Sequence, residues 1–113
     1  MTRLDAYTFH EGFAHLLSYQ ATEIDCVDWH TPQLTEVAAA SRAKLRLALT
    51  ETDPDRQKQF LEEAVCGSYY EKFACMCGML YLADRWETQG IDGLQSAFAD
   101  YHGFAQRALS IRI

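Results

Sequence analysis

The stretch Phe73-Ala74-Cys75-Met76-Cys77-Gly78-Met79-Leu80-Tyr81-Leu82-Ala83 decides the fold class of this 113-residue chain. It is apolar at almost every position, and neither proline nor a charged residue interrupts it. A helix that is apolar almost all round is buried almost all round. We therefore expect a buried central helix over residues 69–88, which other helices or a partner subunit surround.

The segments on either side of this stretch repeat their apolar residues at the spacing of a helix. None of them shows the sustained alternation that is typical of a strand. The further helices that we expect are 6–22, 32–50, 54–66 and 93–110. The sequence therefore predicts an all-α protein, a compact bundle of four to five helices that forms a single domain over residues 1–113.

Two of these helices have clearly marked starts. Thr31-Pro32 and Asp53-Pro54 each place a capping oxygen before a proline in the first helical turn. The short link between the helices 32–50 and 54–66 favours an antiparallel pair.

The first helix has a less definite start. Thr8 and Glu11 fit a capping box, and Asp5 is an earlier alternative cap. Its apolar stripe consists of Phe9, Phe13, Leu16 and Leu17. Residues 22–30 show no apolar period, so we expect a connector there.

Glycines divide the second half of the chain. Gly67 predicts a break before the apolar helix, and Ser68 with Glu71 fits a second capping box. Gly90 predicts the end of the apolar helix. The last helix has an unbroken apolar stripe of Leu94, Ala97, Phe98, Tyr101, Ala105, Ala108 and Leu109.

The composition excludes several classes of protein. With 49% apolar residues and a net charge of -6, the chain is neither disordered nor collagen-like. The absence of a basic stripe argues against direct binding of nucleic acid, because that affinity depends on Lys and Arg. We expect no membrane span and no secretory signal, and therefore a cytoplasmic protein.

Four cysteines and four histidines raise the question of a metal site. Cys75 and Cys77 lie about 200° apart around a helix, so they cannot hold one ion together. Cys26 and His30 are the best local pair, but they need ligands from elsewhere. We expect reduced thiols, with Cys66 and the two helical cysteines inert in apolar surroundings, and no metal or other cofactor.

The sequence contains no phosphate-binding loop, nucleophile elbow, dinucleotide fingerprint or zinc-protease motif. Glu62, Glu63 and Asp84 are candidates for acid–base work. A solvated helix face and an ion pair at a helix end are the simpler explanations. We therefore favour a protein that is not an enzyme.

Binding of another protein has the most support. The connector 22–30 mixes three acids with apolar residues and a tryptophan, a residue type that is enriched at interface hot spots. We expect a surface suited to a basic partner, formed by Glu23, Asp25, Asp28, Trp29 and Trp86. An equally supported alternative is that Ile24, Val27 and Trp29 close the end of the bundle.

The expected function is that of a small acidic protein-binding module, such as an inhibitor, an immunity factor, a small chaperone or an accessory subunit. The alternative is a helical bundle that binds a small ligand or a cofactor (haem, flavin or metal). Its pocket would use Tyr70, Tyr81, Tyr101 and His102. We also expect a homodimer, because four short helices are few to cover an apolar helix on every side.

Overall fold

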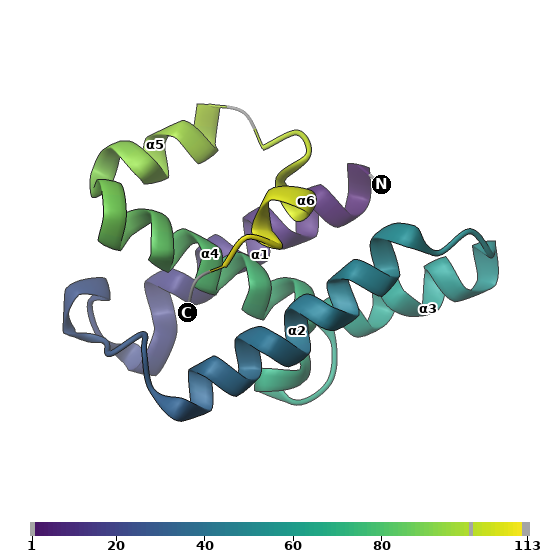
Figure 1. Ribbon diagram of the computed structural model, residues 1–113, viewed down its shortest axis with the longest axis horizontal. Helices are drawn as coiled ribbons and strands as arrows, with labels where there is room; N and C mark the ends of the chain where they lie inside the picture. Colours follow the sequence, from purple (N-terminus) through teal and green to yellow (C-terminus); the bar gives the residue numbers. More distant parts are fainter. Residues whose placement is uncertain (1, 100, 112–113) are drawn as a thin grey trace.

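The architecture is all-helical. The computed structural model describes residues 2–99 and 101–111, which form six α-helices and three short 3-10 helices. The α-helices are α1 Thr2–Ser18, α2 Pro32–Thr50, α3 Pro54–Val65, α4 Phe73–Gln89, α5 Ile91–Ala99 and α6 Phe104–Ala108 (Figure 1). The predicted fold class, an all-α bundle, is confirmed.

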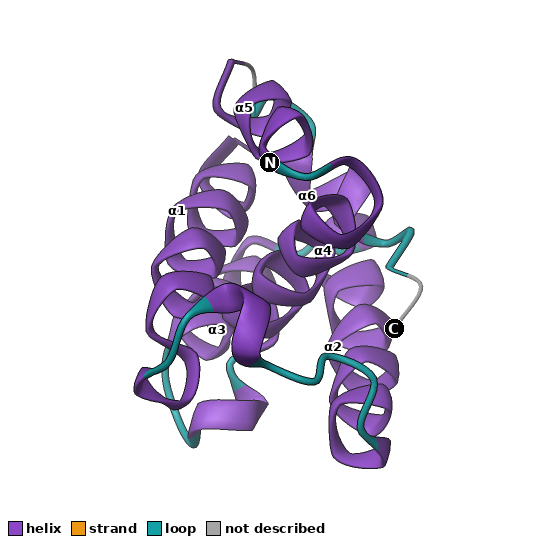
Figure 2. Cartoon of the chain, turned by 90° about the vertical axis from the view of Figure 1, so that its left-hand side faces the viewer, coloured by secondary structure: helices purple, strands orange, loops and turns teal. Residues whose placement is uncertain are grey.

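Helix α4 lies at the centre of the fold, as predicted. Every residue from Phe73 to Leu80 is buried, and the other five α-helices all pack against α4. Figure 2 shows α1 and α2 on opposite sides of it. Because one chain covers its own apolar helix, this helix gives no reason to expect a second copy.

Helices α1 and α4 cross with their backbones in contact at Gly12 and Gly78. A Cβ atom on Gly78 would clash with the carbonyl oxygen of Thr8, and one on Gly12 would lie 2.6 Å from the Cα atom of Gly78. Only residues without a Cβ atom allow the two helices to approach so closely.

Helix α1 begins earlier than predicted, at Thr2 instead of near residue 6, and ends at Ser18. The capping box at Thr8 is wrong, because Thr8 lies inside the helix. Its buried hydroxyl donates to the carbonyl oxygen of Leu4 at 2.7 Å. A threonine hydroxyl can satisfy itself in this way inside a helix, so its presence does not mark a start.

The apolar stripe of α1 is only partly correct. Phe9 and Leu16 are buried, whereas Leu17 is 62% exposed. Beyond the helix, Gln20 adopts a positive φ of 55°, within the 3-10 turn Tyr19–Ala21. This turn ends the helix before residue 22 and leaves Tyr19 buried.

Helices α2 and α3 agree with the predicted bounds to within one residue. The Thr31 hydroxyl accepts a hydrogen bond from the Leu34 backbone N–H at 3.2 Å. The Asp53 carboxylate accepts one from the Asp55 backbone N–H at 3.3 Å. The two predicted caps are confirmed.

The break before α4 is at Gly67, whose φ is +104°. The chain then forms a 3-10 turn over Tyr69–Glu71, and α4 begins at Phe73 instead of at residue 69. Ser68 makes no capping bond through its side chain, so the second capping box is wrong. Gly90, with a φ of +59°, ends α4 as predicted.

The predicted helix 93–110 is two helices. Helix α5 ends at Ala99 and α6 begins at Phe104, with Gly103 at a φ of +72° before it; residue 100 lies outside the described residues. The break lets the two helices take different directions, and α5 lies away from α2 and α3 (Figure 1). Phe98 is 52% exposed, so the predicted continuous buried stripe is wrong at this residue.

None of the helices in the described part of the chain has both the length and the apolar character of a membrane span.

Candidate functional site

A groove of about 460 Å³ lies between the connector and the C-terminal end of α4. The residues that line it are Ile24, Asp25, Val27, Trp29, Trp86, Glu87 and Gly90. The Trp86 indole N–H donates to a carboxylate oxygen of Asp25 at 2.9 Å, across 61 residues of sequence. Two of the five predicted partner-binding residues are therefore in direct contact.

A side-chain contact between His30 and Glu87 holds the connector against α4. The Nε2 atom of His30 lies 2.8 Å from a carboxylate oxygen of Glu87, and the His30 backbone N–H donates to Asp28 at 2.9 Å. Glu23, Asp25 and Asp28 are exposed. The connector thus presents acidic side chains beside the groove, and His30 binds Glu87 instead of forming a metal-ligand pair with Cys26.

Trp29 is not part of the exposed surface that the sequence predicted. Its side chain is 1% exposed, its indole N–H donates to the Ile24 carbonyl oxygen at 3.2 Å, and its ring lies 5.2 Å from that of Tyr19. For this residue the structure favours the alternative, in which the connector closes the end of the bundle. Trp29 forms the floor of the groove, and Trp86 forms its edge.

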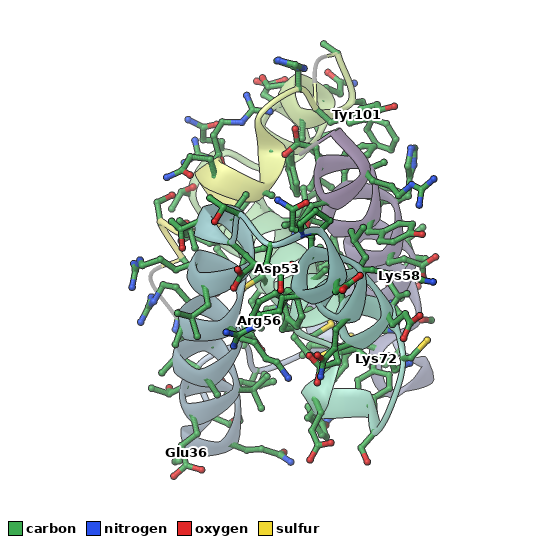
Figure 3. The ribbon with its side chains drawn as sticks, turned by 90° about the vertical axis from the view of Figure 1, so that its right-hand side faces the viewer. Glu36, Asp53, Arg56, Lys58, Lys72 and Tyr101 are labelled. Atoms are coloured by element: carbon green, nitrogen blue, oxygen red, sulfur yellow. The ribbon has the colours of Figure 1, made fainter. Side chains whose placement is uncertain are left out.

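The four residues of the alternative ligand pocket are not brought together. Tyr70 and Tyr81 line two different hollows, Tyr101 stacks on Phe9 with 5.0 Å between ring centroids, and His102 is exposed. Figure 3 shows Tyr101 near the top of the view, well above Lys72, the residue after the Tyr69–Glu71 turn.

The Tyr70 hydroxyl already has a partner inside the protein. It lies 2.9 Å from the Tyr19 hydroxyl, and either oxygen can donate. Burial, together with the bond to Tyr70, raises the pKa of Tyr19 above its ordinary value. The bond between the two hydroxyl groups joins the turn Tyr69–Glu71, which precedes α4, to the turn that follows α1.

A cluster of Glu11, His15 and Cys75 was not predicted. A carboxylate oxygen, a ring nitrogen and the Sγ atom of these residues all lie within 4.8 Å of one another. Glu11 and His15 are four residues apart on α1, which places them on one face of the helix. That spacing was a usable signal, but only the crossing of α1 and α4 adds the thiol.

Hydrogen bonding orients the histidine of this cluster. The Nδ1 atom of His15 lies 2.6 Å from the Glu11 backbone carbonyl oxygen. A carbonyl oxygen only accepts, so Nδ1 carries the hydrogen and the lone pair of the neutral ring is on Nε2. The Tyr69 ring lies 5.3 Å from the imidazole, and the Lys72 ammonium lies 5.3 Å from the centre of the Tyr69 ring.

The cysteines differ in their surroundings. Burial, with a smaller contribution from Glu11, raises the pKa of Cys75 to about 11, and burial raises the pKa of Cys77 to about 12. Both thiols are therefore protonated at neutral pH, which disfavours nucleophilic catalysis by either residue. Cys66 is exposed, so the expectation of an apolar setting is wrong for it, because the chain has already left α3.

No protein-family model matches the chain. No curated protein and no solved structure matches it either. The function is therefore inferred from the chain's own residues.

Proposed function

We propose that the protein is a non-enzymatic acidic module that binds another protein through the groove at the end of α4. The observation that carries this proposal is the hydrogen bond between Trp86 and Asp25. It holds an aromatic ring and a carboxylate side by side at the rim of an open groove. Tryptophan is a frequent centre of binding energy in protein interfaces.

The charge distribution supports a partner with a basic segment. The chain has a net charge of -6, and Glu23, Asp25 and Asp28 are exposed on the connector. Complementary charge accelerates association and selects among partners. Lysine or arginine side chains of the partner would contact these carboxylates, while an apolar side chain would lie against Trp86.

The proposal covers the roles of inhibitor, immunity factor, small chaperone and accessory subunit, which share this mode of action. We place the protein in the cytoplasm, where a reducing environment would keep its exposed thiols, Cys26 and Cys66, unoxidised. The groove is built by one chain, so the proposal does not require a homodimer.

The indole N–H resonances of the two tryptophans provide a direct test by NMR. A synthetic peptide that combines lysine, arginine and leucine is added to the protein, and an acidic peptide of equal length is added to a second sample as the control. The basic peptide should shift the Trp86 resonance more than that of buried Trp29, and salt should weaken its binding. The proposal is overturned if the basic peptide leaves Trp86 unchanged or acts equally on residues far from the groove.

A second test uses a native partner. In a pull-down from native extract, the wild-type protein should retain a partner that the double variant Asp25→Ala/Trp86→Ala does not retain. That partner should present a basic surface. Glu36→Ala is the matched control, because Glu36 is an exposed acid on α2, outside the groove. Equal retention by the groove variant and wild type would contradict the proposal.

A further inference from the structure

The cluster of Glu11, His15 and Cys75 lies where α1 and α4 pack against each other. Its residues come from α1 and α4, next to the place where Gly12 and Gly78 bring the two backbones together. Cys75 is fully buried and Glu11 is exposed, so the cluster extends from the core to solvent.

The three donor atoms have a spacing that a metal ion can use. They lie within 4.8 Å of one another, and ligand atoms of a tetrahedral zinc ion lie about 3.5 Å apart. Small rotations of the Glu11 and His15 side chains close the difference. Glu11 is exposed and His15 is partly exposed, whereas Cys75 is buried.

The chemical types of the donors select the class of metal. Thiolate, imidazole and carboxylate are the three ligand types of zinc, whereas magnesium and calcium prefer oxygen alone. The Glu11 carbonyl oxygen orients His15 through Nδ1, as a backbone carbonyl commonly does for a metal-binding histidine. We propose that Glu11, His15 and Cys75 bind a zinc-like divalent transition-metal ion, with His15 using Nε2 and a water molecule in the fourth position.

Binding balances charge and protons within the site. A bond forms between the metal and Sγ, and the proton of Cys75 passes to solvent. The thiol then gives up its weak contact to the Ala64 carbonyl oxygen, at 3.7 Å. The thiolate and the Glu11 carboxylate together neutralise the two positive charges of the ion. Lys72, which also acts electrostatically on Cys75, is held over the Tyr69 ring.

This site is separate from the proposed protein-binding groove. Cys75 and Trp86 both belong to α4 but are 11 residues apart, which is about 16 Å along the helix axis. Either proposal can therefore fail without the other.

Cobalt(II) tests the site, because a thiolate ligand gives it a characteristic charge-transfer absorption. The double variant Cys26→Ser/Cys66→Ser removes the two exposed thiols and leaves the cluster intact. This variant should bind one equivalent of cobalt with thiolate absorption, and zinc should displace the cobalt. Isothermal titration with zinc should give the same stoichiometry.

Further substitutions in this background assign the ligands. Cys75→Ala should abolish the charge-transfer absorption, and His15→Ala should weaken binding by more than about tenfold. His10→Ala, an exposed histidine on the same helix, should leave binding unchanged. Circular dichroism of each variant without metal checks that the helices remain.

Two results would overturn the proposal. One is the absence of stoichiometric cobalt binding in the double variant. That result would mean that only an exposed cysteine binds metal, or that no cysteine of the protein does. The other is thiolate absorption that survives Cys75→Ala. If Cys75→Ala loses its helices, His15→Ala and Glu11→Gln decide the question, since these residues are not fully buried.

Discussion

The carboxylate of Asp5 in α1 accepts a hydrogen bond from the backbone N–H of Ala105 in α6 at 2.9 Å, although 100 residues separate the two. Its other oxygen accepts from the Gly103 backbone N–H at 3.0 Å. The first turn of a helix has N–H groups without partners in the helix itself. Asp5, which the sequence suggested as a cap for its own helix, caps the start of α6 instead.

Asp5→Ala should therefore lower the free energy of unfolding by about 1–3 kcal/mol, since it leaves buried N–H groups without acceptors. Urea denaturation followed by circular dichroism measures this loss. Glu36→Ala, at an exposed position, should change the free energy by less than about 0.5 kcal/mol. A neutral Asp5→Ala would show that the cap does not stabilise the fold.

Gly78→Ala, which adds a single methyl group, should strongly lower the free energy of unfolding. The new methyl group would clash with the Thr8 carbonyl oxygen, so α1 and α4 must separate at the centre of the fold. We expect a loss of more than about 3 kcal/mol or failure to fold. Thermal and chemical denaturation measure it.

Gly67→Ala is the comparison for Gly78→Ala. Nothing lies within 4 Å of a Cβ atom at Gly67, but its φ is +104°, so this variant pays only a conformational cost of about 1 kcal/mol. Equal losses in the two variants would indicate that close packing of α1 on α4 is not the cause.

The two tryptophans should respond differently to truncation. Trp29 is 1% exposed, so Trp29→Ala should cost about 3–5 kcal/mol of stability. Trp86 is half-buried, so Trp86→Phe, which removes its hydrogen bond to Asp25, should cost about 1 kcal/mol. Chemical denaturation of both variants checks the order, and the reverse order would contradict the assignment of floor and edge.

Alkaline pH should destabilise the protein through Tyr19. The pKa of Tyr19 is raised in the folded state above the ordinary value of 10.0, so the unfolded state loses its proton first. This contribution to stability is complete below about pH 10 and decreases as the pH rises above that value. Denaturation midpoints between neutral and alkaline pH measure the decrease.

Tyr19→Phe should make this pH dependence shallower, although it also removes the hydrogen bond to Tyr70 and lowers stability at neutral pH. Tyr101→Phe is the control, because Tyr101 is 37% exposed. An unchanged slope in Tyr19→Phe would show that another group governs the alkaline loss.

Only part of the candidate sites could be predicted from the sequence. The acids and tryptophans of the connector and of α4 were identifiable, because aromatic and charged residues outside an apolar stripe are noticeable in any sequence. Their arrangement was not: Trp29 is buried and Trp86 meets Asp25 because the connector folds back on the end of α4. The Cys75 cluster needed contact between two helices, which no local spacing reveals.

The sequence by itself determined the helical class, the central position of the apolar helix and the caps at Thr31 and Asp53, because periodicity and capping are local properties. Where the sequence contains no strong local signal, the tertiary structure decided where each helix ends. It divided the last predicted helix at Gly103, where Asp5 caps the new start. Contacts between residues far apart in the sequence stabilise these helix ends, and such contacts exist only after the chain has packed.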